Sequence, residues 1–165
     1  MNKFLIVLLL FFFFLIVSQT GDFNKISDAG GGIYFMYFDS SNSKSTIVEF
    51  EDYIVLIEAP VKDQGGNATD MKDHSFGGEK ILRTLNNYFP AKSLKYFLHS
   101  HWHPHSVSTV NPFLKAGVKV VTTELNYSVI KKFVDTAGIK DYNENLVFVT
   151  DSLEISDNKN KITAY

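Results

Sequence analysis

Four of the chain's five histidines lie within seven residues, and the chain contains no cysteine. The four are His99, His101, His103 and His105, each separated from the next by one residue. Without cysteine, disulfides, thiolate zinc sites and cysteine nucleophiles are excluded, so metal binding depends on imidazole and carboxylate groups. Imidazole suits zinc, copper, nickel or iron. This cluster is the first candidate for chemistry in the sequence.

The alternating spacing of the histidines constrains how they bind a metal ion. In an extended chain, alternate residues share one face and lie about 6.6 Å apart, which lets two neighbouring imidazoles converge on one ion. Four in a straight row would spread over roughly 20 Å, too far for one ion. His105 could rejoin His101 and His103 only if Pro104 turned the chain. The residues alone therefore indicate a metal role for the cluster and leave its ligand set open.

Two alternatives remain open from the residues alone. Ser100, Ser106 and Ser108 lie among the histidines, as Ser-His nucleophilic catalysis would require. Against this, the sequence has no Gly-x-Ser-x-Gly elbow and no nearby acid to orient a histidine. The other alternative is a histidine-rich metal scavenger that binds copper equally well as a short peptide. Asp73 and His74, in a polar segment, are weaker candidate ligands.

The residues around the cluster predict an α/β fold of the α+β sandwich type. Residues 33–38, 46–50 and 53–58 are rich in β-branched and aromatic side chains, which predicts successive antiparallel strands. A polar loop at residues 60–75 separates them from alternating strands and helices. The expected later elements are strands at residues 94–98, 118–121, 146–149 and 161–165, and helices that end before Pro90, span residues 112–116, and bury Leu125, Val129, Ile130, Phe133 and Val134. This order predicts a mixed β-sheet with antiparallel N-terminal strands and flanking helices.

The N-terminus predicts export. Residues 4–17 are fourteen unbroken apolar residues after a basic start, and polar residues follow, as in a signal peptide over residues 1–20. A helix of fourteen residues is about 21 Å long, short of the roughly 30 Å hydrocarbon core, so an uncleaved membrane anchor is the less favoured alternative. We therefore expect a secreted or periplasmic domain at residues 21–165. In a eukaryotic secretory route, Asn67 and Asn126 would be candidate glycosylation sites.

Charge and composition limit the partners. The chain has 165 residues, of which 45% are hydrophobic, with 16 basic and 18 acidic side chains and a formal net charge of −2. This is an ordinary core-forming composition. The charge gives no reason to expect a nucleic acid or an anionic membrane surface as the partner. We expect a small-molecule substrate, whose identity the sequence does not give, and no membrane contact apart from the N-terminal segment.

Several of these segments together resemble the N-terminal half of a metallo-β-lactamase-fold hydrolase. The resemblance is carried by residues 45–60, by residues 94–98 leading into residues 101–104, and by residues 116–123. It covers roughly residues 33–137. The resemblance implies half of an αββα sandwich. Because the family's fold has two similar halves, and this chain stops as the second begins, we expect a domain that is incomplete at its C-terminus.

The metal motif of that family is His-x-His-x-Asp-His. His101 and His103 match its first two histidines, whereas His105 stands at the aspartate position and Ser106 at the third histidine position. In the family the first two histidines bind one zinc ion, and the Asp-His pair serves a second metal and the attacking water. The resemblance therefore implies one zinc ion on His101 and His103, with His105 as a third ligand, and does not carry over a second metal or a catalytic residue.

The function that this resemblance implies is an exported, zinc-dependent hydrolase with an altered metal motif. The alternative is a non-catalytic metal-binding protein, or a degenerate relative that only binds a partner, on the same scaffold. Replacing Asp by His exchanges an anionic oxygen for a neutral nitrogen, which changes the charge at the metal and the available proton acceptor. This departure from the motif is the reason for keeping both functions open.

Overall fold

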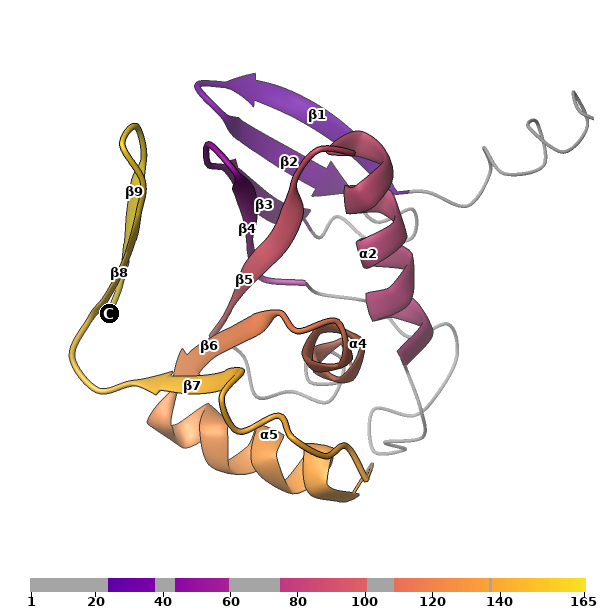
Figure 1. Cartoon of the computed structure of the whole chain (residues 1–165), viewed down its shortest axis with the longest axis vertical. Helices are drawn as coiled ribbons and strands as arrows, with labels where there is room; N and C mark the ends of the chain where they lie inside the picture. The colour runs from indigo at the N-terminus through magenta and orange to yellow at the C-terminus, as the bar shows by residue number, and fades with distance from the viewer. Residues whose placement is uncertain (1–23, 38–43, 60–74, 101–108, 137) are drawn as a thin grey trace, which may run out of the picture.

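The computed structural model describes residues 24–37, 44–59, 75–100, 109–136 and 138–165, and the structural statements below concern those residues. They form a mixed sheet of seven strands and a separate two-stranded hairpin, with helices against the sheet (Figure 1). The elements in chain order are β1 (Lys25–Gly30), β2 (Ile33–Tyr37), β3 (Lys44–Glu49), β4 (Tyr53–Ile57), α2 (Ser75–Tyr88), β5 (Ser93–His99), α4 (Val110–Lys115), β6 (Lys119–Thr123), α5 (Glu124–Thr136), β7 (Leu146–Val149), β8 (Leu153–Ser156) and β9 (Lys161–Ala164).

The seven strands lie side by side in the order in which they occur in the chain. β1 to β4 are antiparallel, whereas β4 to β7 are parallel. The change follows from the connections, because a parallel pair needs a crossover and α2, α4 and α5 supply the three crossovers. The predicted mixed sheet is therefore confirmed, and the carboxyl ends of β4, β5, β6 and β7 lie at one edge.

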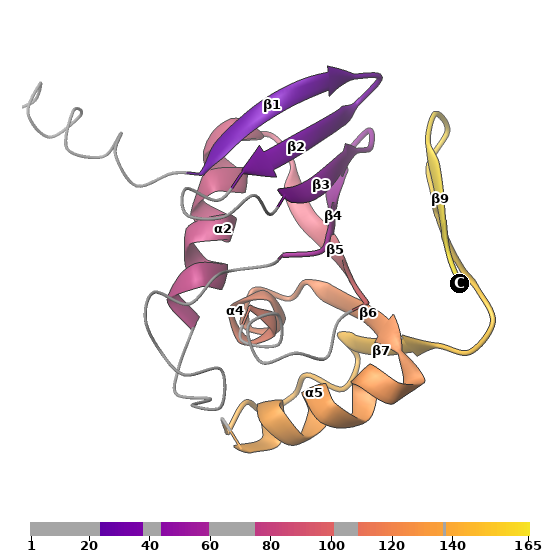
Figure 2. The same ribbon diagram turned by 180° about the vertical axis from the view of Figure 1, so that it is seen from behind.

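The three helices cover one face of the sheet (Figures 1 and 2). Phe97 of β5 lies in this core, with its ring centroid 4.8 Å from that of Phe113 in α4. Burying one such side chain contributes about 1.5–3 kcal/mol relative to leaving it exposed. Other fully buried members of this core, on the sheet and the helices, include Ile54, Leu56, Val120, Ile81, Leu85, Ile130 and Val134.

α2 and α4 approach each other closely at Gly78. A Cβ atom at this position would lie 2.9 Å from the carbonyl oxygen of Thr109 and 2.9 Å from Cγ of Pro112. Carbon atoms do not approach this closely without displacement, so the contact requires a residue that lacks a side chain. This packing fixes the start of α4, directly after the segment that contains the predicted metal ligands.

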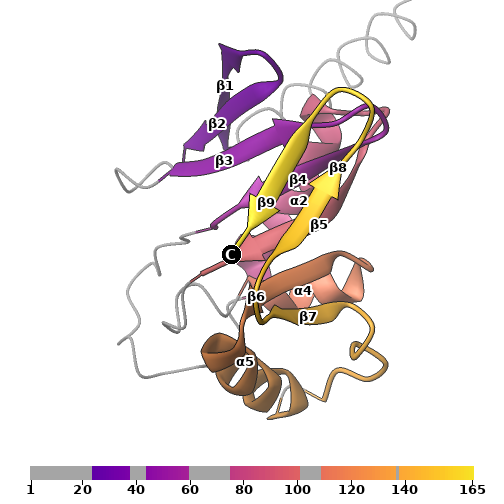
Figure 3. The same ribbon diagram turned by 90° about the vertical axis from the view of Figure 1, so that its left-hand side faces the viewer.

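The hairpin of β8 and β9 lies across the other face of the sheet, over β4 and β5 (Figure 3). Ile155 of β8 packs there with Phe50 and Val55, and partly buried Tyr96 and Leu98 extend the cluster. Hydrogen bonds tie the hairpin to the β3–β4 turn. The Glu51 N–H donates to Asp157 Oδ2 at 2.6 Å, and the Asn160 amide donates to the Glu49 carbonyl at 2.9 Å.

The predicted strands and helices that fall on described residues are present, with two additions and one correction. β1 and β8 are not predicted, because few of their residues are buried and their sequences have no strong apolar alternation. In α5, the prediction that Leu125 and Val129 are buried is wrong, since they are 72% and 37% exposed. Among the described helices, none is long and apolar enough to cross a membrane.

Candidate functional site

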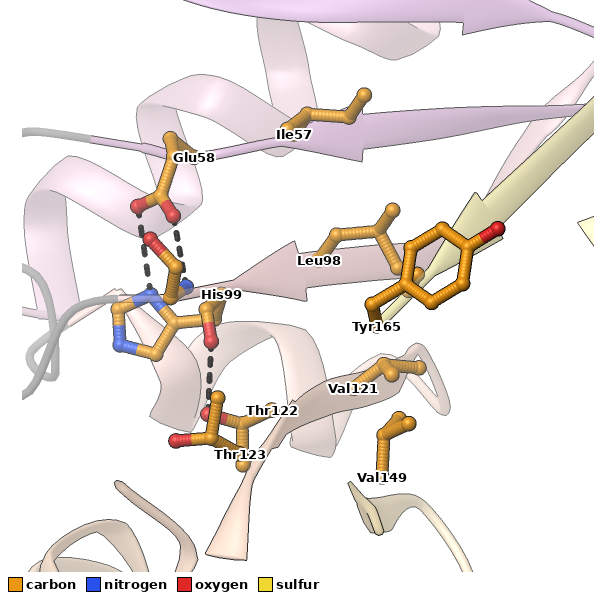
Figure 4. A pocket seen from close by; sticks show the side chains of 11 residues that line it. Ile57, Glu58, Leu98, His99, Val121, Thr122, Thr123, Val149 and Tyr165 are labelled. Carbon is orange, nitrogen blue, oxygen red and sulfur yellow. Dashed lines mark hydrogen bonds and ion pairs between the residues drawn. The ribbon is translucent and has the colours of Figure 1, made fainter. Parts of the chain in front are cut away.

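Four parallel strands bring their carboxyl ends to one edge of the sheet, where Figure 4 shows the side chains that gather. β4 continues into Glu58, β5 ends at His99, β6 ends at Thr123 and β7 ends at Val149. In α/β sheets, ligands bind in crevices outside the carboxyl ends of the strands. The edge is therefore the candidate functional site.

The segment that contains the histidine cluster leaves the sheet at this edge. It follows Ser100, directly after β5, and returns to described structure at Thr109, a buried residue that precedes α4. Within the described part of the chain, no group of three His, Asp or Glu side chains is placed to hold a metal ion. Outside the described residues lie the predicted ligands and the weaker candidates, namely His101, His103, His105, Asp73 and His74.

His99 is the histidine of the cluster that the structure describes, and it is packed into the protein. The residue is 2% exposed, and its ring stacks on Phe97 with centroids 5.2 Å apart and an interplanar angle of 27°. Its carbonyl oxygen accepts a hydrogen bond from the Thr122 hydroxyl at 2.7 Å. We therefore assign His99 to the support of the site.

Glu58 reaches from the end of β4 to the end of β5. Its backbone N–H donates to the Leu98 carbonyl at 3.0 Å, which continues the pairing of the two strands. Its carboxylate Oε1 accepts the Ser100 N–H at 2.7 Å, and Oε2 lies 3.8 Å from Nδ1 of His99. Figure 4 shows the carboxylate turned toward His99. A hydrogen bond to an ionised carboxylate is stronger than one between neutral groups.

Asn126, on α5, holds the chain at Ser100, directly after β5. The residue is 2% exposed, and its side-chain amide donates to the Ser100 carbonyl at 2.8 Å. Its backbone N–H lies 3.4 Å from the Thr123 hydroxyl oxygen, the contact that an N-cap residue makes at the start of a helix. Ser100 is thus held at its N–H by β4 and at its carbonyl by α5, one residue before His101.

A cavity of about 270 Å³ adjoins this edge. One part of its lining is apolar and comes from β4, β5, β6 and β7, whereas Glu58, His99 and Thr123 add polar groups (Figure 4). Ligand sites typically combine an apolar wall with a few placed polar groups. The apolar lining consists of Ile57, Leu98, Val121, Val149, Ala164 and the ring of Tyr165.

Solved structures similar to this chain are metallo-β-lactamases. One, from Pontibacter korlensis, matches with a TM-score of 0.60 and 14% sequence identity, over 86% of this chain and 60% of that chain. Another, from Hirschia baltica, matches with a TM-score of 0.52 and 14% identity, over 86% of this chain and 66% of that chain. This chain therefore spans less than two thirds of either. No protein-family model and no curated protein sequence matches it.

These matches identify the fold of the chain. The chain has the metallo-β-lactamase fold, with a mixed sheet and flanking helices that correspond to part of the solved proteins. The fold class and the resemblance predicted from the sequence are confirmed at this level. The metal, the export and the altered motif are taken up below as proposals.

Three residues that support the site are not among the sequence predictions: Glu58, Thr122 and Asn126. A signal exists for Asn126, because it stands with Ile130 and Phe133 at helical spacing and is polar where the neighbours are apolar. The signal for Glu58 is weaker, since it is only an acidic residue after an apolar strand. Nothing in the sequence alone pairs either residue with Ser100.

Proposed function

We propose that this chain is an exported protein that binds one zinc ion through His101, His103 and His105 and hydrolyses a small-molecule substrate. The observation that carries the proposal is the point at which the histidine segment leaves the sheet. It begins after Ser100, at the carboxyl edge of the parallel strands and next to the cavity. This is the edge at which open α/β sheets bind ligands.

The donor groups of the chain fit zinc. Three imidazoles and one open position form a ligand set typical of catalytic zinc. Metal-ligating histidines are usually oriented by carboxylates and carbonyls in a surrounding shell. Glu58 supplies a carboxylate at the edge from which the histidine segment starts. Bound zinc supplies Lewis-acid chemistry, which acidifies water and polarises a carbonyl group.

The described residues contribute binding and exclusion of water. Ile57, Leu98, Val121 and Val149 form an apolar wall of the cavity. An apolar part of a substrate would displace water from this wall, which contributes about 25 cal/mol for each Å² that is buried. Thr123, exposed at the end of β6, offers a hydroxyl at the polar side of the cavity.

A second candidate function is metal binding without catalysis. His105 replaces the aspartate of the family motif and Ser106 replaces its third histidine. Both replacements remove groups that serve the second metal and the attacking water in proteins with the complete motif. A chain with this change retains a site for one ion and lacks the usual proton acceptor. This is the observation that favours the second candidate.

The test combines zinc content with turnover in the purified mature protein. We expect one zinc ion per chain, lost in His101→Ala and His103→Ala and retained in His74→Ala, a variant that tests the weaker candidate ligand His74. Turnover of any ester, lactam or thioester that disappears in His103→Ala supports the hydrolase. Zinc binding with no turnover supports the second candidate, and a mature protein that takes up no zinc contradicts both.

A peptide spanning residues 99–105 separates the folded site from a metal scavenger. A site built by the fold should bind zinc or copper more tightly in the whole protein than in the peptide, because folding organises the ligands beforehand. Equal affinity in the peptide and the protein would instead support a scavenger and contradict a site that depends on this fold.

A further inference from the structure

The apolar wall of the cavity is built from neighbouring positions of the sheet. The strand registers pair Ile57 of β4 with Leu98 of β5, and Leu98 with Val121 of β6. Residues that pair across strands lie on the same face of a sheet, so these three side chains form one row. Val149 of β7 pairs with Thr123, two residues after Val121, and extends the row on the same face.

The other side of the cavity comes from the end of the β8–β9 hairpin. Ala164, the last residue of β9, and Tyr165 line it, and Figure 4 shows the Tyr165 ring turned toward the same space. Tyr165 is 89% exposed, so its ring lies at the opening of the cavity. Ile155 packs the hairpin against the sheet, and Asp157 fixes the far end of the hairpin, so contacts elsewhere hold the two sides in place.

The volume of the cavity limits the size of its ligand. The cavity holds about 270 Å³. An apolar cavity of roughly 150 Å³ already accepts one benzene molecule. Sites for drug-sized ligands occupy roughly 300–1,000 Å³. The cavity therefore suits a hydrocarbon group of about six to ten carbon atoms.

The charges at the cavity disfavour an anionic ligand. Among the described residues that line it, Glu58 is the one acidic residue, and none is lysine or arginine. The Glu58 carboxylate accepts the Ser100 N–H at 2.7 Å and lies 3.8 Å from Nδ1 of His99. A carboxylate bound against the apolar wall would lose its hydration without contacting a lysine or an arginine, which is unfavourable. The buried part of the ligand is therefore uncharged.

Thr123 supplies a hydrogen-bond donor at the polar end of the wall. Its hydroxyl oxygen accepts the Asn126 N–H at 3.4 Å, which leaves the hydroxyl hydrogen to donate elsewhere. The hydroxyl of Thr122, in contrast, donates to the His99 carbonyl at 2.7 Å. Of the two threonines that line the cavity, Thr123 is therefore the one suited to donate to a carbonyl oxygen of a ligand.

We propose that this cavity binds the uncharged acyl group of the substrate, with the hydrocarbon chain on the apolar wall and the carbonyl oxygen toward Thr123. The substrate class is then a neutral ester or thioester with an acyl chain of about six to ten carbon atoms. The assignment of this molecule as a substrate rests on the proposed function. Binding of the acyl group depends only on residues that the structure describes.

The test uses neutral primary amides, from propanamide to octanamide, as probes of the metal-free mature protein in the presence of EDTA. Nuclear magnetic resonance titration measures their affinities. Each added methylene group should increase the affinity about fourfold, because it is buried on the apolar wall. Hexanamide should bind about tenfold or more tightly than the hexanoate anion at pH 7.

Two substitutions fill the cavity from opposite sides. Val149→Phe, from the sheet, and Ala164→Leu, from the hairpin, should each weaken hexanamide binding about tenfold or more, because the probe loses its place on the wall. Urea unfolding shows that each variant is folded. Val147→Phe is the matched control, since Val147 is half-buried on the same strand and face and does not line the cavity. It should bind hexanamide as the wild type does.

The position of the carbonyl group has its own test. Thr123→Val removes the donor and should weaken hexanamide binding about fivefold, whereas Thr123→Ser keeps the hydroxyl and should retain the affinity. Equal affinities of these two variants would overturn the placement of the carbonyl oxygen at Thr123.

The outcomes for the cavity and for the proposed function are distinguishable. Affinity that does not increase with chain length, or unchanged hexanamide binding in both filling variants, would overturn the inference, as would equal losses in Val149→Phe and Val147→Phe. If hexanamide binds as expected and the zinc-loaded protein hydrolyses no ester, the proposed function fails and the binding site stands. If the zinc-loaded protein hydrolyses esters at rates independent of acyl length and binds no amide, the inference fails and the proposed function stands.

Discussion

Asn126 illustrates how one polar side chain on an apolar helix face supports the site. It is 2% exposed and donates to the Ser100 carbonyl at 2.8 Å. The same residue begins an Asn-x-Ser triplet, but the side-chain nitrogen to which a glycan would attach is buried and engaged in the folded chain. Its place on α5 is therefore explained by the contact with Ser100.

Asn126→Ala should destabilise the protein by about 1–2 kcal/mol, because the variant leaves the Ser100 carbonyl without this donor and opens a small space. Urea unfolding followed by circular dichroism measures the loss. Ser128→Ala is the control, since Ser128 is exposed on the same helix and should change stability by less than about 0.5 kcal/mol. Equal stability of Asn126→Ala and Ser128→Ala would contradict the role assigned to the Asn126 amide.

Single residues also mark the limit of sequence reasoning about the site. The spacing of the histidines is visible in the sequence, so candidate ligands can be named. The residues that support the site cannot be named in the same way. Glu58 and Ser100 are 42 positions apart and meet only through the register of β4 and β5. Registers between distant strands are set by packing of the whole sheet, and no local pattern encodes them.

The hydrophobic periodicity of the sequence predicts the strands and helices that have a clear buried face, and it fails for those that have none. β4 is buried at three of its five positions and β6 at three of five, and both are found where apolar residues run together. β1 has no buried residue and β8 has one, and both strands gain their structure from pairing with β2 and β9. The predicted buried face of α5 is wrong at Leu125, because the observed buried face is centred on Asn126, Ile130 and Phe133.

At the edge of the sheet opposite the site, a charged cluster connects β2, β3 and the start of β5. The Glu49 carboxylate lies 2.7 Å from Nζ of Lys92 and accepts the Tyr34 hydroxyl at 2.7 Å. Hydrogen bonds from Lys92, and then from Tyr34, hold the pKa of Glu49 below its ordinary value of 4.5. Because the folded-state pKa is lowered, this cluster stabilises the protein above about pH 4.5 and loses its effect as the pH falls further.

Glu49→Gln should therefore destabilise the protein at pH 7 by about 1 kcal/mol, since one partly exposed charged contact is lost. The difference between wild type and variant should shrink at pH 3, where protonation of Glu49 weakens the same contact in the wild type. Urea unfolding of both proteins at the two pH values measures this. A difference that stays constant between pH 7 and pH 3 would contradict the assignment.

At the scale of the whole molecule, the sheet has two differently covered faces. Helices pack on one face, and the β8–β9 hairpin lies across β4 and β5 on the other (Figures 2 and 3). The fold matches solved metallo-β-lactamases over 86% of this chain and 60% of the Pontibacter korlensis protein. Its mixed sheet could be predicted because antiparallel strands precede the strand–helix alternation in the sequence.

The proposed export predicts a shortened mature protein. Expression of the full chain with its own N-terminus should yield exported protein whose intact mass lacks roughly the first 20 residues, because the apolar segment has signal-peptide character. Mass spectrometry of the exported fraction, beside a variant with Leu8→Arg in the apolar segment, measures this. Full-length chain that stays with the membrane would support the uncleaved anchor instead.

Zinc binding by the histidine segment is the central claim, and calorimetric titration of zinc chloride into the mature protein tests it most directly. We predict one zinc ion per chain in the wild type and in His74→Ala, and loss of this binding in His101→Ala and in His103→Ala. Absence of zinc uptake by the wild type, or equal uptake by the wild type and both cluster variants, would contradict the claim.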